Sequence, residues 1–265
     1  MQRFFLAALF LSLFTLTVNA KTETGFLNRT MKIGATLHRY QVYVPADWNA
    51  KKKMPVILFL HGAGERGDDG VIQTEVGIGG AVRRHPDRAQ AIIVFPQCLK
   101  NNWWSEPQMQ TVALTALDLS IKEFNGDAER LYLTGISMGG YGTWAIASAH
   151  PNRFAALAPV CGGVKVPERI AKQLNIANPP GDDPYQTVAQ KIGKTSVWIF
   201  HGGADAIVPV TESQCMNEAL KAAGGNVKYS EYEGVNHNSW DRAYNETEFF
   251  TWLLSQRLNK GKATP

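Results

Sequence analysis

A single serine stands between glycines in the segment GISMG, residues 135–139, which has the pattern G-x-S-x-G. An apolar, strand-like run precedes this segment and a helical run follows it, so Ser137 is predicted to occupy a sharp strand-to-helix turn. Such a turn crowds its neighbours, and the glycines two residues away on either side lack the Cβ that would clash. The hydroxyl would then project at a helix N-terminus, which favours negative charge. This setting predicts that Ser137 is a nucleophile.

A serine hydroxyl is a weak nucleophile that needs a base, and the base needs a carboxylate to orient it. In a strand–turn–helix setting these partners are expected after later strands, with the acid before the histidine. Asp205 follows the strand-like run Ser196–Phe200, and His237 follows the run Val227–Tyr232. We therefore predict a catalytic triad of Ser137, Asp205 and His237.

Other titratable residues compete for these roles but fit them less well. His61 and His201 precede glycines at strand ends, where a structural hydrogen bond is the more expected role. The carboxylates that stay open as alternatives to Asp205 are Asp182, Asp183 and Asp241.

An acyl-transfer site also needs donors for the oxyanion that forms on the substrate. One donor is expected to be the backbone N–H of Met138, directly after the nucleophile. The second is expected from the loop after an earlier strand, and the glycine-rich segment LHGAG, residues 60–64, is such a loop. We predict the N–H of Ala63 as this second donor.

The elements that must position these residues show the pattern of a parallel sheet. Short apolar runs without strict alternation are separated by helical patterns, which indicates a mostly parallel sheet covered by helices on both faces. After a strand pair within Gly25–Tyr43, the predicted strands are Pro55–Leu60, Ala91–Phe95, Arg130–Leu133, Phe154–Val160, Ser196–Phe200 and Val227–Tyr232. The predicted helices lie within Gln108–Phe124, Tyr141–Ala149 and Thr211–Ala223, and the segment Glu246–Leu258 closes the chain. In the first of these helices the predicted buried face comprises Leu114, Leu117, Ile121 and Phe124.

Residues 1–20 have the features of a signal peptide, and residues 21–265 are expected to form one domain. The apolar run Phe4–Val18 is shorter than the roughly 20 residues that span a bilayer, and small residues precede a cleavage point after Ala20. We therefore expect a secreted or periplasmic protein without a stable membrane anchor. Within the domain, Val164–Lys194 is too long for a simple connection and is expected to be an insertion before the strand that delivers the acid.

Composition excludes several functions. The formal net charge of +4 is mild and no basic patch is evident, so no nucleic-acid partner is expected. The histidines and cysteines lack zinc-type spacing, so neither a metal nor another cofactor is expected. The pairing of Cys98, Cys161 and Cys215 and the oligomeric state stay open. Candidate pocket residues, which stack on a substrate or pack the loops, are Trp103, Trp104 and Trp240.

Six blocks of sequence, found in order between about Tyr40 and Tyr244, together resemble the α/β-hydrolase superfamily. They are LFLHGAGERGDD, FPQC, LYLTGISMGGYGTW, HPNRFAALAPVCGG, WIFHGGADAIVPV and EYEGVNHNSWDRAY. More narrowly, the chain is similar to exported esterases grouped with polyhydroxybutyrate depolymerase-like and phospholipase/carboxylesterase-type proteins that are called predicted peptidases. This resemblance implies Ser137 as nucleophile, Asp205 as acid and His237 as base. The longer Val164–Lys194 segment departs from the family, so the resemblance implies no particular substrate.

The sequence thus predicts a serine hydrolase that cleaves small or polymer-borne carboxylic esters through an acyl-enzyme. A serine peptidase on the same triad is the alternative, but a peptidase of this fold usually carries an additional domain, for which the chain has no room. A non-catalytic binding protein is the third interpretation, and the intact order of the three triad residues argues against it.

Overall fold

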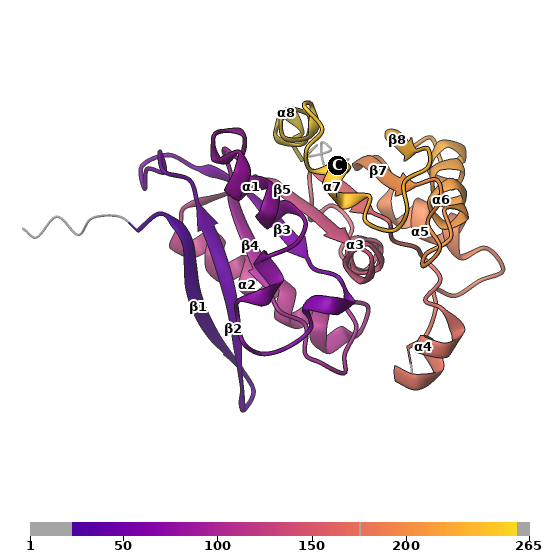
Figure 1. The fold of residues 1–265 in the computed structure, drawn as a ribbon, viewed down its shortest axis with the longest axis horizontal. Coiled ribbons are helices and arrows are strands. Elements are labelled where there is room, and N and C mark those ends of the chain that lie inside the picture. The colour runs from indigo at the N-terminus through magenta and orange to yellow at the C-terminus, as the bar shows by residue number, and fades with distance from the viewer. Residues whose placement is uncertain (1–22, 175, 259–265) are drawn as a thin grey trace, which may run out of the picture.

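The computed structural model describes residues 23–174 and 176–258, so the predicted signal peptide lies outside the described residues. These residues form an eight-stranded sheet with the strand order β1-β2-β4-β3-β5-β6-β7-β8 (Figure 1). The strands are β1 (Gly25–Ile33), β2 (Thr36–Val44), β3 (Met54–Leu60), β4 (Ile92–Pro96), β5 (Gly126–Ile136), β6 (Ala156–Val160), β7 (Ser196–Gly202) and β8 (Val227–Tyr232). Only the β1–β2 and β2–β4 pairs are antiparallel, whereas β3 to β8 run parallel. The predicted α/β architecture with a mostly parallel sheet is confirmed.

Helices cover both faces of the sheet, and each face has its own apolar core. The α-helices are α1 (Ile78–Arg84), α2 (Pro107–Glu123), α3 (Met138–Ala149), α4 (Glu168–Leu174), α5 (Pro184–Ile192), α6 (Thr211–Ala222), α7 (Trp240–Ala243) and α8 (Phe249–Ser255). One core contains side chains from α2, α3, α5 and α6, and the other contains side chains from α1, α7 and α8. Figure 1 shows α1 and α8 above the strands and α2 and α3 below them. Short 3-10 helices are η1 (Ala63–Glu65), η2 (Ile72–Thr74) and η3 (Pro86–Arg88).

Helix α2 buries a face that only partly coincides with the one predicted. Leu117 and Phe124 are buried as predicted, but Leu114 and Ile121 are only partly buried. The buried stripe comprises Met109, Val112, Ala113, Ala116, Leu117 and Ser120. The stripe includes two alanines and a serine, which a pattern of large apolar side chains does not reveal.

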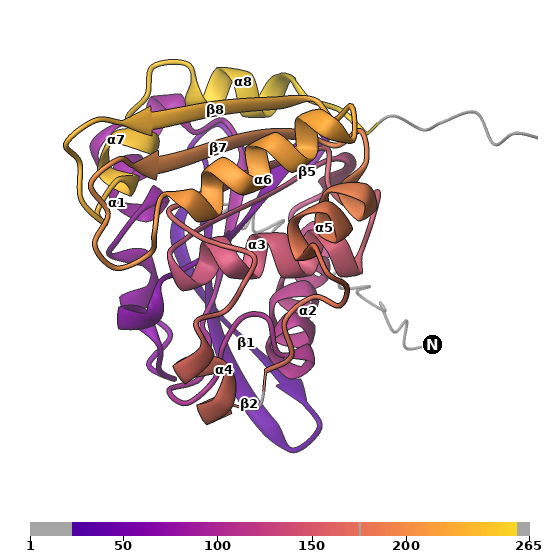
Figure 2. The same ribbon diagram turned by 90° about the vertical axis from the view of Figure 1, so that its right-hand side faces the viewer.

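The segment Val164–Lys194 contains two helices that the sequence analysis did not predict. Helix α5 buries Val188 and Ile192 among the side chains of the α2–α3 face. Its first N–H groups are capped by the carboxylate of Asp183, which accepts from the N–H groups of Tyr185 and Gln186. Helix α4 has no buried residue, and Figure 2 shows it set apart from α5 and α6. The segment is therefore partly core and partly surface.

No helix among the described residues has the length and apolar character that crossing a membrane requires.

Of the two roles left open for Trp104, substrate stacking and loop packing, the structure shows packing in the core. Its side chain is fully buried, and its indole N–H donates to the carbonyl of His61 over 3.0 Å. The indole also packs edge-on against the imidazole of His61, with ring centroids 5.1 Å apart. In sequence, a tryptophan beside glycine-rich loops is typical of a residue that stacks on a substrate. Here it packs against the loop after β3.

His61 is buried at the end of β3 and has a structural role, as expected. Its Nε2 accepts from the backbone N–H of Cys98 over 2.9 Å, which leaves Nδ1 to donate to the carbonyl of Gly62 over 2.6 Å. This tautomer is neutral, and a proton on Nε2 would break the bond from Cys98. Burial lowers the pKa of His61 to about 4. The imidazole therefore stays neutral and ties the loop after β3 to the loop after β4.

Helix α3 lies so close to β3 that only glycine fits at its contact points. A Cβ on Gly139 would lie 1.9 Å from the carbonyl oxygen of Leu60, and one on Gly135 would lie 2.4 Å from the carbonyl oxygen of Gly139. These contacts are with backbone, which cannot rotate away. The glycines flanking Ser137 are therefore required by packing as well as by the turn.

Gly139→Ala should disrupt the fold, because the new methyl group would overlap the β3 backbone. We expect the free energy of unfolding to fall by about 4 kcal/mol or more, measured by urea denaturation. The matched control is Gly64→Ala, whose added Cβ would meet no atom within 4 Å. Equal stability of the two variants would contradict the packing described above.

The low pKa of His61 predicts that acid destabilises the protein. In the unfolded chain His61 binds a proton near pH 6.5, whereas in the folded protein it does so only near pH 4. The contribution of neutral His61 to the free energy of unfolding is therefore complete above pH 6.5 and is lost as the pH falls towards 4. His61→Gln should remove about 3 kcal/mol of the rise in unfolding free energy between pH 4 and 7. Urea denaturation at several pH values measures this, with the exposed His150→Gln as control. An unchanged pH dependence in His61→Gln would be the contrary result.

Candidate active site

Ser137 occupies the junction between β5 and α3 in a strained backbone conformation. Its φ of 51° and ψ of −116° lie in a region that residues with a Cβ rarely adopt. Two backbone hydrogen bonds hold it there, since its N–H donates to Val160 and its carbonyl accepts from Tyr141. The predicted strand-to-helix turn is therefore present, with β5 ending at Ile136 and α3 beginning at Met138.

The three residues predicted as a triad form a hydrogen-bonded chain. His237 Nε2 lies 2.9 Å from the hydroxyl oxygen of Ser137, and His237 Nδ1 lies 2.7 Å from Oδ2 of Asp205. Asp205 lies in the loop after β7 and His237 in the loop after β8. Because β5, β7 and β8 run parallel, their carboxyl ends bring these loops to one edge of the sheet.

Asp205 is a buried carboxylate with four hydrogen-bond partners. Its side chain has no exposed surface, and burial alone would raise its pKa. Hydrogen bonds from His201, His237 and the N–H groups of Val208 and Ile207 outweigh burial and hold the pKa of Asp205 well below its usual range. The carboxylate is therefore ionised at neutral pH and can stabilise a positive charge on His237.

His201 is a partner of Asp205 that the sequence analysis assigned only a structural role. Its Nε2 lies 3.0 Å from the carbonyl of Val208 and 3.3 Å from Oδ2 of Asp205. Its Nδ1 lies 2.6 Å from the hydroxyl of Ser213, which donates if Nε2 carries the proton. In this tautomer one imidazole N–H faces both the Val208 carbonyl and the Asp205 carboxylate. In the sequence, the spacing of four residues between His201 and Asp205 was the signal that could have indicated this contact.

The carboxylates that were alternatives to Asp205 take other positions. Asp183 caps α5, while Asp182 and Asp241 are exposed. The carboxylate that the structure joins to His237 is Asp205.

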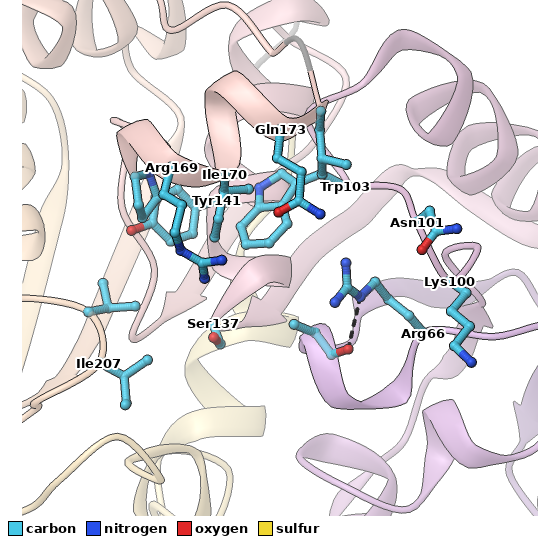
Figure 3. A pocket seen from close by; sticks show the side chains of 14 residues that line it. Arg66, Lys100, Asn101, Trp103, Ser137, Tyr141, Arg169, Ile170, Gln173 and Ile207 are labelled. Atoms are coloured by element: carbon cyan, nitrogen blue, oxygen red, sulfur yellow. Dashed lines mark hydrogen bonds between the residues drawn. The ribbon is translucent and has the colours of Figure 1, made fainter.

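The two amides predicted as oxyanion donors are the first residues of their helices. Met138 begins α3 and Ala63 begins η1, so neither N–H has an acceptor within its own helix. Ala63 and Ser137 line the same cavity. The carbonyl of Ala63 accepts from Nε of Arg66 over 3.0 Å, which closes the η1 turn (Figure 3). Two amides at helix starts beside the hydroxyl are suited to bind a negatively charged oxygen.

A cavity of about 530 Å³ opens in front of Ser137. This volume is in the range of small-molecule sites. Part of its wall is α4, which contributes Ile170 and Leu174 from the segment that the sequence analysis treated as an insertion. Trp103 also lines the cavity, as Figure 3 shows. Trp240 instead packs edge-on against His237, with ring centroids 5.5 Å apart.

The three cysteines are free in the described residues, with Cys98 and Cys161 buried and Cys215 exposed. Burial raises the pKa of Cys161 to about 12, so it is a neutral thiol. Its sulfur, an oxygen of Asp205 and a nitrogen of His237 lie within 4.8 Å of one another, a spacing that could hold a metal ion. The same Asp205 and His237 side chains are hydrogen-bonded to each other, and a metal would compete with that bond. The absence of a metal cofactor stays a prediction.

The known proteins that are similar to this chain include two secreted or esterase relatives and an esterase of known structure. A feruloyl esterase B from Thermothelomyces thermophilus is 25% identical over 226 residues, which cover 74% of this chain and 73% of that protein. An uncharacterized secreted protein from Arthroderma benhamiae is 26% identical over 235 residues, or 80% of this chain, but the match spans only 24% of that protein. The crystal structure of a thermostable esterase is 32% identical with a TM-score of 0.73, and the match covers 88% of this chain and 63% of the esterase chain.

The family model for the prolyl oligopeptidase family matches residues 104–259, which include all of α3 and the loops after β7 and β8. The resemblance to α/β-hydrolases is confirmed by this match and by the fold shared with the esterase structure. The chain therefore belongs to the prolyl oligopeptidase family, within the serine hydrolases of the α/β-hydrolase superfamily.

Proposed function

We propose that this protein is an exported serine carboxylesterase in which Ser137, His237 and Asp205 are the catalytic triad. The observation that carries the proposal is the continuous hydrogen-bonded chain from the Ser137 hydroxyl through His237 to Asp205. The nucleophile lies at a helix start and faces a cavity large enough for a small ester. The role of each residue follows from its place in this chain.

The reaction begins when His237 Nε2 accepts the proton of the Ser137 hydroxyl while Oγ attacks the acyl carbon. The carbonyl oxygen becomes an oxyanion, and the N–H groups of Ala63 and Met138 donate to it. The ester bond then breaks, and the alcohol leaves with the proton that His237 returns. Water repeats the sequence on the acyl-enzyme and releases the acid, so that Ser137 recovers its proton.

Asp205 stabilises the imidazolium that forms on His237 in each half of the reaction. Its pKa is held low by the hydrogen bonds described above, so Asp205 keeps its negative charge and does not take the proton. The additional contact to His201 fixes the carboxylate in the orientation that faces His237.

We propose esters rather than peptides as substrates, although the family is named after a peptidase. Support comes from the names of the similar proteins, a feruloyl esterase and a thermostable esterase. The secreted relative and the signal-like residues 1–20 support export to a secreted or periplasmic location.

Ser137→Ala should abolish ester hydrolysis while leaving the fold intact. Loss of the nucleophile in a serine hydrolase costs a factor of about 10⁵ or more in kcat. The assay is release of 4-nitrophenol from 4-nitrophenyl butyrate, with the urea midpoint as the check on folding. A fluorophosphonate should label Ser137 in the wild-type protein. The matched control is Ser148→Ala, in the same helix but partly exposed on its last turn. Retained hydrolysis in Ser137→Ala, or a label on another residue, would refute the assignment.

A further inference from the structure

The cavity in front of Ser137 is lined by cations, and none of its lining residues in the described part of the chain is acidic. Its charged lining residues are Arg66, Lys100 and Arg169, and the other lining residues are uncharged. They come from three separate segments, namely the end of η1, the loop after β4, and α4. Figure 3 shows the guanidinium groups of Arg66 and Arg169 pointing into the space between α4 and the loop that carries Arg66. The walls of the cavity therefore carry a concentrated positive charge.

None of these three cations forms an ion pair with a carboxylate of the described residues. Arg66 donates to the carbonyls of Ala63 and Asn102, which hold the guanidinium in place without neutralising it. Arg169 has an acidic neighbour in Glu168, but Glu168 pairs with Lys172 instead. Outside the cavity, some arginines of the described residues have a carboxylate partner (Arg29, Arg83, Arg130, Arg153 and Arg257) and others do not (Arg39, Arg84, Arg88 and Arg242). The cavity differs in that its three unpaired cations surround one space.

Three unpaired cations around one cavity attract an anion, because a concave wall concentrates their field. The remaining lining includes apolar side chains such as Trp103, Ile170 and Leu174. A small inorganic anion would make no contact with this apolar part of the lining. The lining therefore fits a molecule with an apolar body and a carboxylate.

The direction of the proton transfer indicates which part of the ester occupies the cavity. His237 must reach the oxygen of the departing alcohol, so the alcohol lies on the His237 side of Ser137. The cavity is lined by Ser137 and Ala63 but not by His237. The acyl group therefore extends into the cavity.

We propose that the preferred substrates are esters whose acyl group ends in a carboxylate, such as monoesters of dicarboxylic acids. Arg169 and Arg66, whose guanidinium groups point into the cavity, bind the carboxylate, and Lys100 at the margin adds positive charge. This inference rests on the proposed esterase function, since it assigns the acyl specificity of that site.

The test compares two esters of nearly equal shape, 4-nitrophenyl hydrogen adipate and its neutral terminal amide. The adipoyl chain is long enough to disfavour attack of the carboxylate on its own ester. Charge-assisted hydrogen bonds predict that kcat/KM is about tenfold or more higher for the anionic ester. Added salt should reduce this preference, because ions screen exposed charges. A preference for the neutral ester, or equal values, would overturn the inference.

The variant Arg169→Gln should reduce the anionic-to-neutral ratio of kcat/KM by about tenfold. Lys172→Gln is the matched control, since Lys172 lies on the same helix but does not line the cavity. Lys100→Gln, in a different loop, should lower the ratio as well and replaces Arg169→Gln if that variant does not fold. A ratio that stays at the wild-type value in both cavity variants would also overturn the inference.

Failure of this inference is distinguishable from failure of the proposed function. Hydrolysis of the neutral ester that depends on Ser137 supports the esterase whatever the ratio is. If neither ester is hydrolysed, the esterase proposal fails, and calorimetric binding of both esters to Ser137→Ala tests the cavity. Tighter binding of the anionic ester, weakened by Arg169→Gln, supports the carboxylate site, and equal binding refutes it.

Discussion

The backbone of Ser137 is the constraint on which the rest of the site depends. A φ of 51° turns the chain sharply from β5 into α3 and presents the hydroxyl at the sheet edge. The turn is stable only because glycines at 135 and 139 let α3 lie against the backbone of β3. The same close approach places the loop after β3, with Ala63, beside the nucleophile. The strain at one residue and the positions of the two amides proposed as oxyanion donors thus have one structural origin.

The site also depends on a buried negative charge on Asp205, which hydrogen bonds stabilise. Asp205 has no exposed surface, and an isolated carboxylate there would be protonated. Hydrogen bonds from His201, His237 and two backbone N–H groups together keep it ionised. The charge is therefore present before His237 accepts a proton, which is what a site that stabilises a transient imidazolium requires.

The sequence predicted what depends on local pattern. The order of Ser137, Asp205 and His237 after successive strands was visible because strand ends and turn residues are neighbours in sequence. Long-range packing decided the rest. The alanine-rich face of α2 is buried because it fits the strands, and Trp104 is in the core because His61 accepts its N–H. Helix α4 spans only seven residues, and its apolar pair Ile170 and Leu174 was too short a pattern to reveal it. The cations it helps to gather come from three segments far apart in sequence.

Trapping the acyl-enzyme is the most direct test of the claim that Ser137, His237 and Asp205 form a working triad. The wild-type protein is mixed with a 4-nitrophenyl ester, quenched in acid within the first turnover, and analysed by mass spectrometry of the intact chain and its peptides. The account predicts a mass increase equal to one acyl group, confined to the peptide that contains Ser137. Turnover of the ester with no covalent adduct, or an adduct on another residue, would contradict it.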